Sequence, residues 1–459
     1  MIRNKNKANN GITLIALVIT IIVLLILAGV TIATLMGDNG LLTKAQEAKV
    51  ENDKAGEREK LQVEIMGSFG TDGKIDIDQL NENLKNLGIE NAGINKLPAK
   101  VEIGENAYVI TGNGVISNLI SMTEAQSDSM LTNTENMAVE DEYGNIVIIP
   151  AGFKVVIDEG TKSASHVTEG IVIEDNDIII YEDGTKSTGN QFVWVPVGKI
   201  YTTADEATKE STAKTIKLSR YEFETDGTPI DRGSSAIKDE VINTYTEDTI
   251  EGDNAHAINI TDFKNKTNSA GGYYIARYEA SYGTDGKVNS KISTGIPIQT
   301  NGTEPETEGL LWNNINQPDA AKASRVMYSS EEFTSDLVNS YAWDTAIVFI
   351  QTFGGVDYEA YSMQDGKSIN SNLTNTGVNG DNPLNINDIA SNTVEWTTET
   401  YSNLDSPFTY RGGYYNSSSR RTFVRSDASG SNCNFTFRPL LYVQNWTLWK
   451  PRFSTDFRF

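Results

Sequence analysis

A run of polar residues near the end of the chain lies between two groups of aromatic and aliphatic residues. The first group falls within 388–415, the polar run extends over 416–434, and the second group is Phe435-Thr-Phe-Arg-Pro-Leu-Leu-Tyr442. Ser, Asn, Arg and Asp dominate the run. Apolar groups are driven out of water, whereas polar groups can remain in it. We therefore expect a fixed scaffold that carries an adaptable polar surface, which either catalyses a reaction or binds a ligand.

The composition disfavours several classes of function. At 459 residues the chain is too long for one compact core, so two or more folded units are expected. Its net charge of −24 argues against nucleic acid as a partner, because phosphate binding requires clustered Lys and Arg. The single cysteine, Cys433, can form neither an intramolecular disulfide nor a thiolate metal cluster. The two histidines, His166 and His256, lie far apart in sequence, so a metal site or a Ser-His-Asp triad is poorly supported.

The N-terminal region has the pattern of a membrane anchor. A basic leader with Arg3, Lys5 and Lys7 precedes 11–37, a stretch that contains no charged residue. At about 1.5 Å per residue, a helix of roughly 25 apolar residues spans a hydrocarbon core of about 30 Å. Basic residues favour the cytoplasmic side, so the C-terminal domain is predicted to be extracellular. We expect a cell-surface protein that contacts the membrane through this helix, which continues as a charged helix to residue 66.

The segment Gly11-Ile-Thr-Leu-Ile15 resembles the processing site of type IV prepilins. The resemblance implies that a prepilin peptidase is a partner and cuts between Gly11 and Ile12. The apolar helix would then pack into a filament or stay in the membrane. Ala16 departs from the family pattern, which has Glu at this position, and this puts polymerisation in doubt. A plain signal anchor is the alternative.

The residue composition and the pattern of apolar residues change twice in the middle of the chain. Residues 67–120 combine a short amphipathic helix with alternating apolar runs, which predicts a small α+β module of pilin-like layout. Ser, Thr, Asn and Glu then dominate 121–135, as is typical of a linker. Many short strand-like runs follow, and one strong helix is predicted over 334–353. The predicted fold class is α+β, with a long N-terminal hydrophobic helix ahead of the module.

Six short segments follow this linker in a fixed order. They are Gln191-Phe-Val-Trp-Val-Pro196, Gly272-Tyr-Tyr-Ile-Ala-Arg-Tyr-Glu279, Ala342-Trp-Asp-Thr-Ala346, Asn392-Thr-Val-Glu-Trp396, Arg411-Gly-Gly413 and Phe437-Arg438. In this order they resemble the formylglycine-generating enzyme family (sulfatase-modifying factor), whose domain is a variant of the C-type lectin fold. The resemblance implies a lectin-type domain with short irregular strands and long loops. Trp194, Trp343 and Trp396 are large enough to fill its core.

The chain is accordingly divided into six parts. They are a prepilin-type leader (1–11), a hydrophobic anchor helix with its extension (12–66), a small α+β module (67–120), a linker (121–135), the lectin-type domain (136–443) and an unassigned aromatic tail (444–459).

The catalytic residues of this family are missing from the chain. The family uses a cysteine pair shortly after Arg-Gly-Gly to bind copper, and the matching positions here are Ser417 and Thr422. Hydroxyl groups cannot supply the soft thiolate ligands that copper(I) requires. Cys433 lies too far along the chain to match either position. We therefore expect a binding domain and not an enzyme; an active oxidase with relocated chemistry is the alternative.

The family also has a calcium site formed by two side chains and two carbonyl groups. The resemblance carries this site onto Asp388, Ser391, Thr393 and Glu395, and hard oxygen donors of this kind suit Ca²⁺. A bound ion would brace the loop beneath the polar run. A simple turn with a capped carboxylate is the alternative.

Charged residues and glycines bracket the polar run. Arg411, Arg438 and Glu395 could hold its ends through charge-assisted hydrogen bonds, a purely structural role. Gly412 and Gly413 are expected where the backbone adopts a conformation closed to other residues.

Segment 414–436 has the composition of an antibody paratope, in which Tyr gives rigid contact area and Ser, Asn and Gly give adaptable hydrogen bonds. Its location also resembles the variable region of target proteins of diversity-generating retroelements, which share the lectin-type fold. Mutagenesis at adenines diversifies Asn codons in that family, and Cys433 between two asparagines fits such an origin. A fixed polar loop is the alternative. The residues predicted to contact a ligand are Tyr414, Tyr415, Asn416, Ser418, Ser419, Arg420, Arg421, Arg425, Ser426, Asp427, Ser429, Ser431, Asn432, Cys433 and Asn434.

The sequence thus predicts an adhesin or receptor that displays a lectin-type domain and binds a surface protein or a glycan. A minor pilin or pseudopilin that acts in filament assembly or secretion is the alternative.

Overall fold

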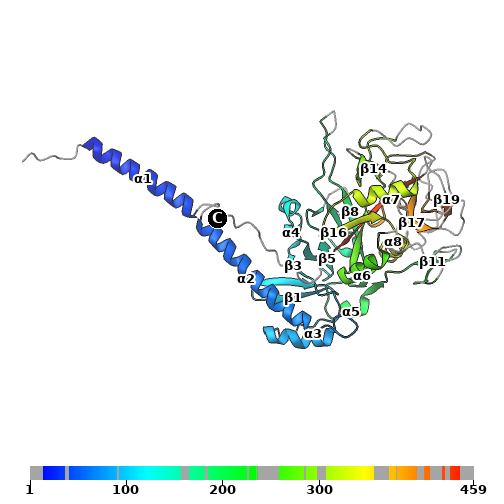
Figure 1. Cartoon of the computed structure of the whole chain (residues 1–459), viewed down its shortest axis with the longest axis horizontal. Coiled ribbons are helices and arrows are strands. Elements are labelled where there is room, and N and C mark those ends of the chain that lie inside the picture. Colours follow the sequence, from blue (N-terminus) through cyan, green and yellow to red (C-terminus); the bar gives the residue numbers. More distant parts are fainter. Residues whose placement is uncertain are drawn as a thin grey trace, which may run out of the picture. The chain divides into compact units, whose positions relative to one another are not determined.

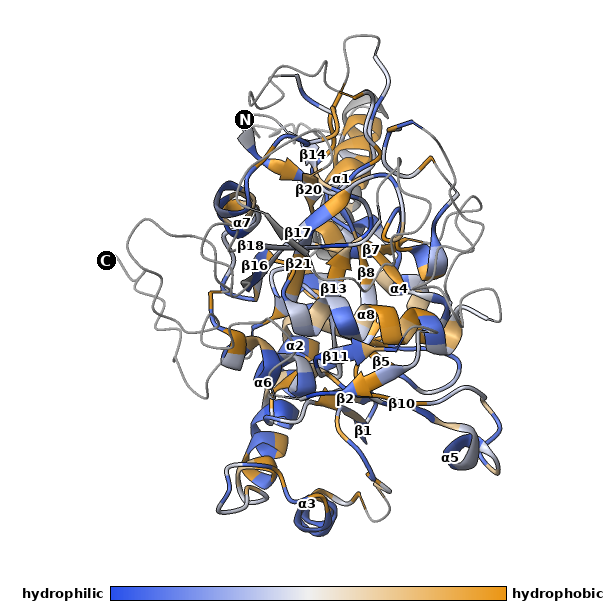
Figure 2. Cartoon of the chain, turned by 90° about the vertical axis from the view of Figure 1, so that its right-hand side faces the viewer, coloured by the Kyte–Doolittle hydropathy of each residue, from blue (hydrophilic) through white to orange (hydrophobic). Residues whose placement is uncertain are grey.

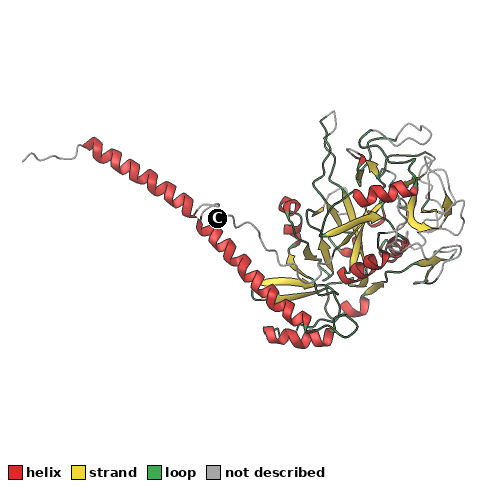
Figure 3. Cartoon of the chain, in the orientation of Figure 1, coloured by secondary structure: helices red, strands yellow, loops and turns green. Residues whose placement is uncertain are grey.

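The structure is a computed structural model of the whole chain (Figure 1). It describes residues 14–36, 41–89, 92–156, 165–180, 184–224, 227–233, 235, 258–283, 286–296, 307–355, 372–378, 380–400, 408–413, 426–428 and 435–444. The chain forms two compact units, residues 1–64 and 65–459. Figure 3 shows that strands and loops make up most of the second unit.

The N-terminal region contains two helices, α1 (Leu14–Met36) and α2 (Leu41–Met66), in place of the single long hydrophobic helix that we predicted. Charged residues are spread along α2. Within the described residues, no helix has both the length and the apolar character needed to cross a membrane. This finding contradicts the predicted fold class in its N-terminal part, and it contradicts the membrane-anchored, cell-surface localisation. Gly11 and Ile12 lie outside the described residues.

In the second unit, helix α3 (Ile77–Leu84) and η1 (Lys85–Leu87) are followed by a five-stranded sheet. Its strands follow one another in space as in sequence, and β3 pairs with β4 in parallel through Leu119 and Ala138. The strands are β1 (Ala99–Ile103), β2 (Asn106–Ile110), β3 (Ile116–Ile120), β4 (Met137–Glu140) and β5 (Ile146–Ile149). Residues on both sides of the predicted linker therefore belong to one sheet.

The predicted linker itself is folded. It contains α4 (Met122–Ala125) and η2 (Asp128–Thr132), and Ala125 and Met130 are buried in the core. The Ser121 hydroxyl caps α4 by accepting a hydrogen bond from the Glu124 N–H at 3.1 Å. A few well-placed apolar residues are thus sufficient to fix a segment whose composition is mostly polar.

A six-stranded sheet forms the centre of the second unit, in the spatial order β16-β21-β13-β8-β7-β6. Its described neighbours pair in antiparallel fashion. Its strands are β6 (Lys154–Val156), β7 (Val172–Glu174), β8 (Gln191–Pro196), β13 (Gly272–Ala276), β16 (Phe333–Leu337) and β21 (Pro439–Val443).

Both faces of the six-stranded sheet are buried. On one face Trp194 and Tyr274 pack with residues of the five-stranded sheet, and their ring centroids lie 4.9 Å apart. On the other face Val193 and Tyr273 pack against α8 (Ser340–Phe353) and its Trp343. Alternate residues of β8 and β13 therefore point to opposite layers, as the pleat of a strand requires. Figure 2 shows the hydrophobic residues along α8 in orange.

The predicted helix over 334–353 begins later than expected. Residues Phe333–Leu337 form β16, and the helix begins at Ser340 because the Asn339 side chain caps it. The cap is a hydrogen bond from the Ala342 N–H to Asn339 Oδ1 at 3.0 Å.

A four-stranded sheet carries the ends of the polar run, in the order β19-β18-β17-β20 (orange to red in Figure 1). The strands are β17 (Val394–Thr400), β18 (Phe408–Arg411), β19 (Ser426–Ala428) and β20 (Phe435–Phe437). Trp396 lies at the centre of this sheet. The ring of Trp396 stacks on that of Phe435 at a centroid distance of 4.4 Å, and the Trp396 Nε1–H donates to the Ile315 carbonyl at 2.8 Å.

Short elements complete the second unit. They are η3 (Val167–Glu169), β9 (Gly198–Ile200), α5 (Lys209–Thr212), β10 (Lys214–Ile216), β11 (Tyr221–Phe223), β12 (Pro229–Asp231), α6 (Ile260–Ala270), β14 (Ser281–Tyr282), β15 (Val288–Asn289), α7 (Gln317–Val326) and η7 (Pro383–Asn385).

Candidate functional site: a polar run held on one strand

Strand β17 holds both ends of the polar run. It lies between β18, which precedes the run, and β20, which follows it. Glu395 of β17 pairs in register with Arg411 on one side and with Thr436 on the other. The chain therefore enters the polar run from β18, on one side of β17, and continues from the run into β20, on the other side of β17.

The first end of the run is fixed by Arg411, whose side chain is fully buried. Its Nε donates to Glu399 Oε2 at 2.6 Å, and its Nη1 donates to Asp344 Oδ1 at 2.9 Å. Both carboxylates are also buried, and Asp344 Oδ2 accepts a further hydrogen bond from the Tyr221 N–H at 2.8 Å. Two charge-assisted bonds thus tie the start of the run to β17 and to α8.

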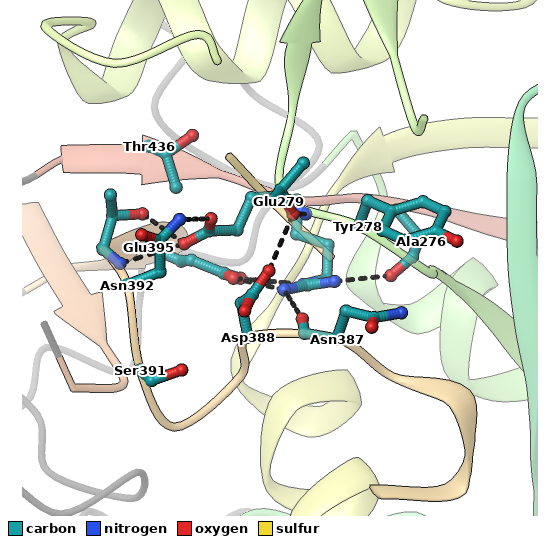
Figure 4. A network of polar contacts seen from close by, with 12 residues as sticks. Ala276, Tyr278, Glu279, Asn387, Asp388, Ser391, Asn392, Glu395 and Thr436 are labelled. Carbon is teal, nitrogen blue, oxygen red and sulfur yellow. Dashed lines mark hydrogen bonds and ion pairs between the residues drawn. The ribbon is translucent and has the colours of Figure 1, made fainter. Parts of the chain in front are cut away.

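The second end is fixed by Arg438, which is equally buried. Its Nη2 and Nε donate to the two oxygens of Glu395, at 2.6 Å and 3.0 Å. Its Nη1 also donates to the Ala276 carbonyl at 2.8 Å, and its Nη2 donates to the Asn387 carbonyl at 2.7 Å; Figure 4 labels these two residues and Glu395. Burial alone would lower the pKa of Arg438, but the charge and hydrogen bonds of Glu395, together with the charges of Glu279 and Asp388, outweigh burial and raise the pKa.

We predicted that Arg411, Arg438 and Glu395 hold the ends of the run through charge-assisted hydrogen bonds. This is confirmed for Glu395 and Arg438. The partners of Arg411 are Glu399 and Asp344, which we did not predict. The sequence held one signal for Glu399. It lies four residues after Glu395, a spacing that a regular strand places on one face, although β17 is irregular between Trp396 and Thr400.

Gly412 follows Arg411 and has a backbone that other residues rarely adopt. Its φ is +83°, and a Cβ at this position would lie 3.1 Å from the Ile389 carbonyl oxygen and 3.6 Å from the Trp343 ring. The prediction that a special backbone requires glycine here is confirmed for Gly412.

A second carboxylate lies beside the Arg438 pair. Glu279 Oε1 accepts a hydrogen bond from the Thr393 N–H at 3.0 Å, and its Oε2 accepts one from the Asn392 side chain (Figure 4). Glu279 is completely buried. Burial, reinforced by the negative charges of Asp388 and Glu395, raises the pKa of Glu279 well above its usual range.

Asp388 lies in a tight turn with a φ of +61°. Its Oδ2 accepts hydrogen bonds from the Gly377 N–H at 2.6 Å and from the Thr376 hydroxyl at 2.9 Å. Burial raises the pKa of Asp388 to about 6, in spite of these two donors. Left-handed backbone at a non-glycine residue is costly, so the surrounding bonds must hold this turn in place.

The four predicted calcium ligands lie in one buried segment. Ser391 donates its hydroxyl to Asp381 Oδ2 at 2.9 Å, and Thr393 is bonded to Glu279. Of the two carboxylates, Glu395 is occupied by Arg438, so an ion would have to compete with the guanidinium for its oxygens. Among the described residues, no three His, Cys, Asp or Glu side chains gather around a shared metal position. Calcium at these residues stays a prediction.

Most residues of the predicted ligand-contacting set lie outside the described residues, namely those at 414–425 and 429–434. The same holds for Ser417, Thr422 and Cys433. Ser426 and Asp427 lie on β19, where the structure describes the backbone. That backbone pairs with β18, with Asp427 opposite Thr409.

Comparison with known proteins gives weak likenesses. No family model matches the chain, and no curated protein matches it. Solved structures similar to this chain include CarF, with 16% identity, a TM-score of 0.28, and coverage of 38% of this chain and 87% of CarF. They also include Treponema denticola variable protein 1, with 12% identity, a TM-score of 0.29, and coverage of 57% of this chain and 98% of that protein. With TM-scores this low, neither likeness adds to the functional assignment, which rests on the geometry of the chain itself.

Proposed function

We propose that this chain is a ligand-binding protein with a lectin-type domain, and that segment 414–436 forms its binding surface. The observation that carries the proposal is the pair of buried arginines, Arg411 and Arg438, at the two ends of this segment. Each is held by carboxylates outside the run, Glu395 and Glu399 on β17 and Asp344 on α8.

This arrangement separates stability from recognition. The ends of the run are fixed by ion pairs, by Trp396 and by the strand pairing of β17. We propose that Ser, Asn, Arg and Tyr between those ends serve a ligand and contribute little to the stability of the domain. Tyr and Ser-rich surfaces give contact area and adaptable hydrogen bonds at low entropic cost.

Binding without catalysis is part of the proposal. Ser417 and Thr422 stand where the resembled enzymes have the copper-binding cysteines, and hydroxyl groups are poor ligands for copper(I). We further propose that the run is diversified by a retroelement. Its density of Asn, Ser, Arg and Tyr, and Cys433 between two asparagines, support that origin. The ligand would be a protein or a glycan.

A binding screen with a matched variant tests this function. The full-length chain is screened on protein and glycan arrays beside a variant in which Asn416, Arg420, Arg421, Arg425 and Asn432 are replaced by alanine. We expect at least one specific ligand for the native chain, loss of that ligand in the variant, and an unchanged midpoint of thermal unfolding. Retention of the ligand by the variant, or the absence of any ligand for the native chain, would count against the proposal.

A further inference from the structure

Lys291 is a buried lysine away from the polar run. It follows β15, and its side chain is 2% exposed. Its Nζ donates to the Asp177 carbonyl and lies 3.3 Å from Asp177 Oδ2. Lysine is rarely buried to this extent, because its charge is costly to remove from water, so the position calls for a chemical explanation.

Asn190 shares the same carboxylate. It lies directly before β8 and is 2% exposed. Its Nδ2 donates to Asp177 Oδ2 at 3.1 Å and to Asp175 Oδ2 at 3.0 Å, and its Oδ1 accepts a hydrogen bond from the Ser290 N–H at 2.9 Å. One oxygen of Asp177 therefore contacts both the amine of Lys291 and the amide of Asn190.

From this geometry we propose that Lys291 and Asn190 become joined by an intramolecular amide (isopeptide) bond once the chain has folded. The Lys291 Nζ attacks the Asn190 Cγ, a new C–N bond forms, the bond between Cγ and Nδ2 breaks, and the nitrogen leaves as ammonia. The lysine ammonium group and the side-chain amide give the new amide and an ammonium ion. No oxidant, reductant or further reactant is required.

The neighbours of the two side chains supply what this reaction needs. Asp177 Oδ2 accepts a proton from Nζ and returns one to the departing Nδ2, as a general base and then a general acid. The Ser290 N–H donates to the Asn190 Oδ1, where negative charge develops in the transition state. The fold holds amine and amide beside each other, which replaces an encounter in solution by a reaction between neighbours. The side chain of Asp177 is 60% exposed, so the ammonia has a path to water.

The bond closes the chain into a loop over residues 190–291. This loop contains β8 and β13, which pair at the centre of the six-stranded sheet, and the long polar stretch at 203–270. Cys433 is the single cysteine of the chain, so a disulfide cannot close such a loop. A covalent cross-link restricts the unfolded chain and thereby favours the folded state. An amide gives this chain a cross-link that its cysteine content rules out.

Peptide mapping of the full-length chain by mass spectrometry tests the bond. Trypsin should release residues 187–199 joined to residues 288–322, because an acylated Lys291 is no longer a cleavage site. The joined pair should weigh less than the two separate peptides by one ammonia molecule. In a denaturing gel the native chain should migrate ahead of Lys291→Arg, because a closed loop makes the unfolded chain more compact.

Three variants identify the groups that react. Lys291→Arg keeps the positive charge but lacks the nucleophilic amine, so the joined pair should be absent. Lys287→Arg alters an exposed lysine four residues earlier and should retain the joined pair. Asp177→Ala removes the proton carrier and should slow formation of the bond by about a hundredfold or more, measured as the joined fraction against time after cell-free synthesis.

Each other outcome counts against the proposal. Separate peptides 187–199 and 288–291 from the native chain would overturn it. Loss of water in place of ammonia, with Lys291 joined to residue 177, would overturn it as well, because the acceptor would then be Asp177. Formation of the bond at the native rate in Asp177→Ala would remove Asp177 from the reaction. The bond is independent of the proposed function, which concerns segment 414–436, so its failure leaves ligand binding untouched.

Discussion

Removal of Arg438, which lies between β20 and β21, should lower the stability of the protein by several kcal/mol. In Arg438→Met, Glu395 loses the bonds to both of its oxygens, and the carbonyls of Ala276 and Asn387 lose their donors. Breaking a buried ion pair from one side costs about 3–5 kcal/mol, because the remaining charge stays buried without a partner. We expect the free energy of unfolding, measured by urea titration, to fall by about that amount.

Two further variants establish the cause. Lys85→Met removes an exposed ion pair with Glu82 and should cost less than about 1 kcal/mol. Glu395→Gln in the Arg438→Met background removes the unpaired charge and should recover part of the loss. The deficit of Arg438→Met should also shrink in acid, because burial already raises the pKa of Glu395 and a protonated carboxyl needs no cation. A loss of less than about 1 kcal/mol for Arg438→Met would refute the reasoning.

Further predictions follow from the structure. Gly412→Ala should lower the free energy of unfolding by about 1–3 kcal/mol in urea titration, since φ is +83° and the Ile389 carbonyl is close. Gly272→Ala should destabilise by about 1–3 kcal/mol or more in the same assay, because the new methyl group would lie 2.4 Å from the Trp194 ring. The folded-state pKa of Asp388, about 6, is above its unfolded value, so its contribution is complete below about pH 4 and is lost as the pH rises through 6. A pH series of unfolding midpoints should show this decline, and Asp388→Asn should flatten it. If calcium binds as predicted, its addition should raise the midpoint of the native chain and leave that of Asp388→Asn unchanged.

Local patterns predicted the scaffold of the site well. Trp194, Trp343 and Trp396 are all fully buried, as their size and surroundings indicate. The Glu395–Arg438 pair was also predictable, since both residues belong to short segments with distinctive patterns. Such features depend on residues that are close in sequence or on chemistry that allows few alternatives.

Long-range partners were not predictable in the same way. Asp344 lies 67 residues before Arg411, and only the packing of α8 against β17 brings the two together. Residues 334–337 were assigned to a helix because Leu337 fits the spacing of the apolar face of the helix that follows. In the structure these residues form a strand, because β16 pairs with β21 and the Asn339 cap starts the helix only at Ser340.

The N-terminal prediction was wrong for another reason. An apolar stretch indicates burial, but it does not determine where a helix ends. In the sequence, Gly37-Asp-Asn-Gly40 separates the apolar stretch from the charged one, and Gly and Asn favour helix ends. The anchor interpretation did not weigh this signal.

The central claim is that buried ion pairs outside the run at 416–434 fix its two ends, and that the side chains of the run serve binding and contribute little to stability. The most direct measurement is a displayed library of the full-length chain in which every position of the run, and also Glu395, Glu399, Arg411 and Arg438, is randomised singly. Folded variants are recovered by their resistance to protease, which reports the free energy of unfolding. We predict that the run tolerates most substitutions, while the four charged positions tolerate few. Equal intolerance across the run and these four positions would contradict the account.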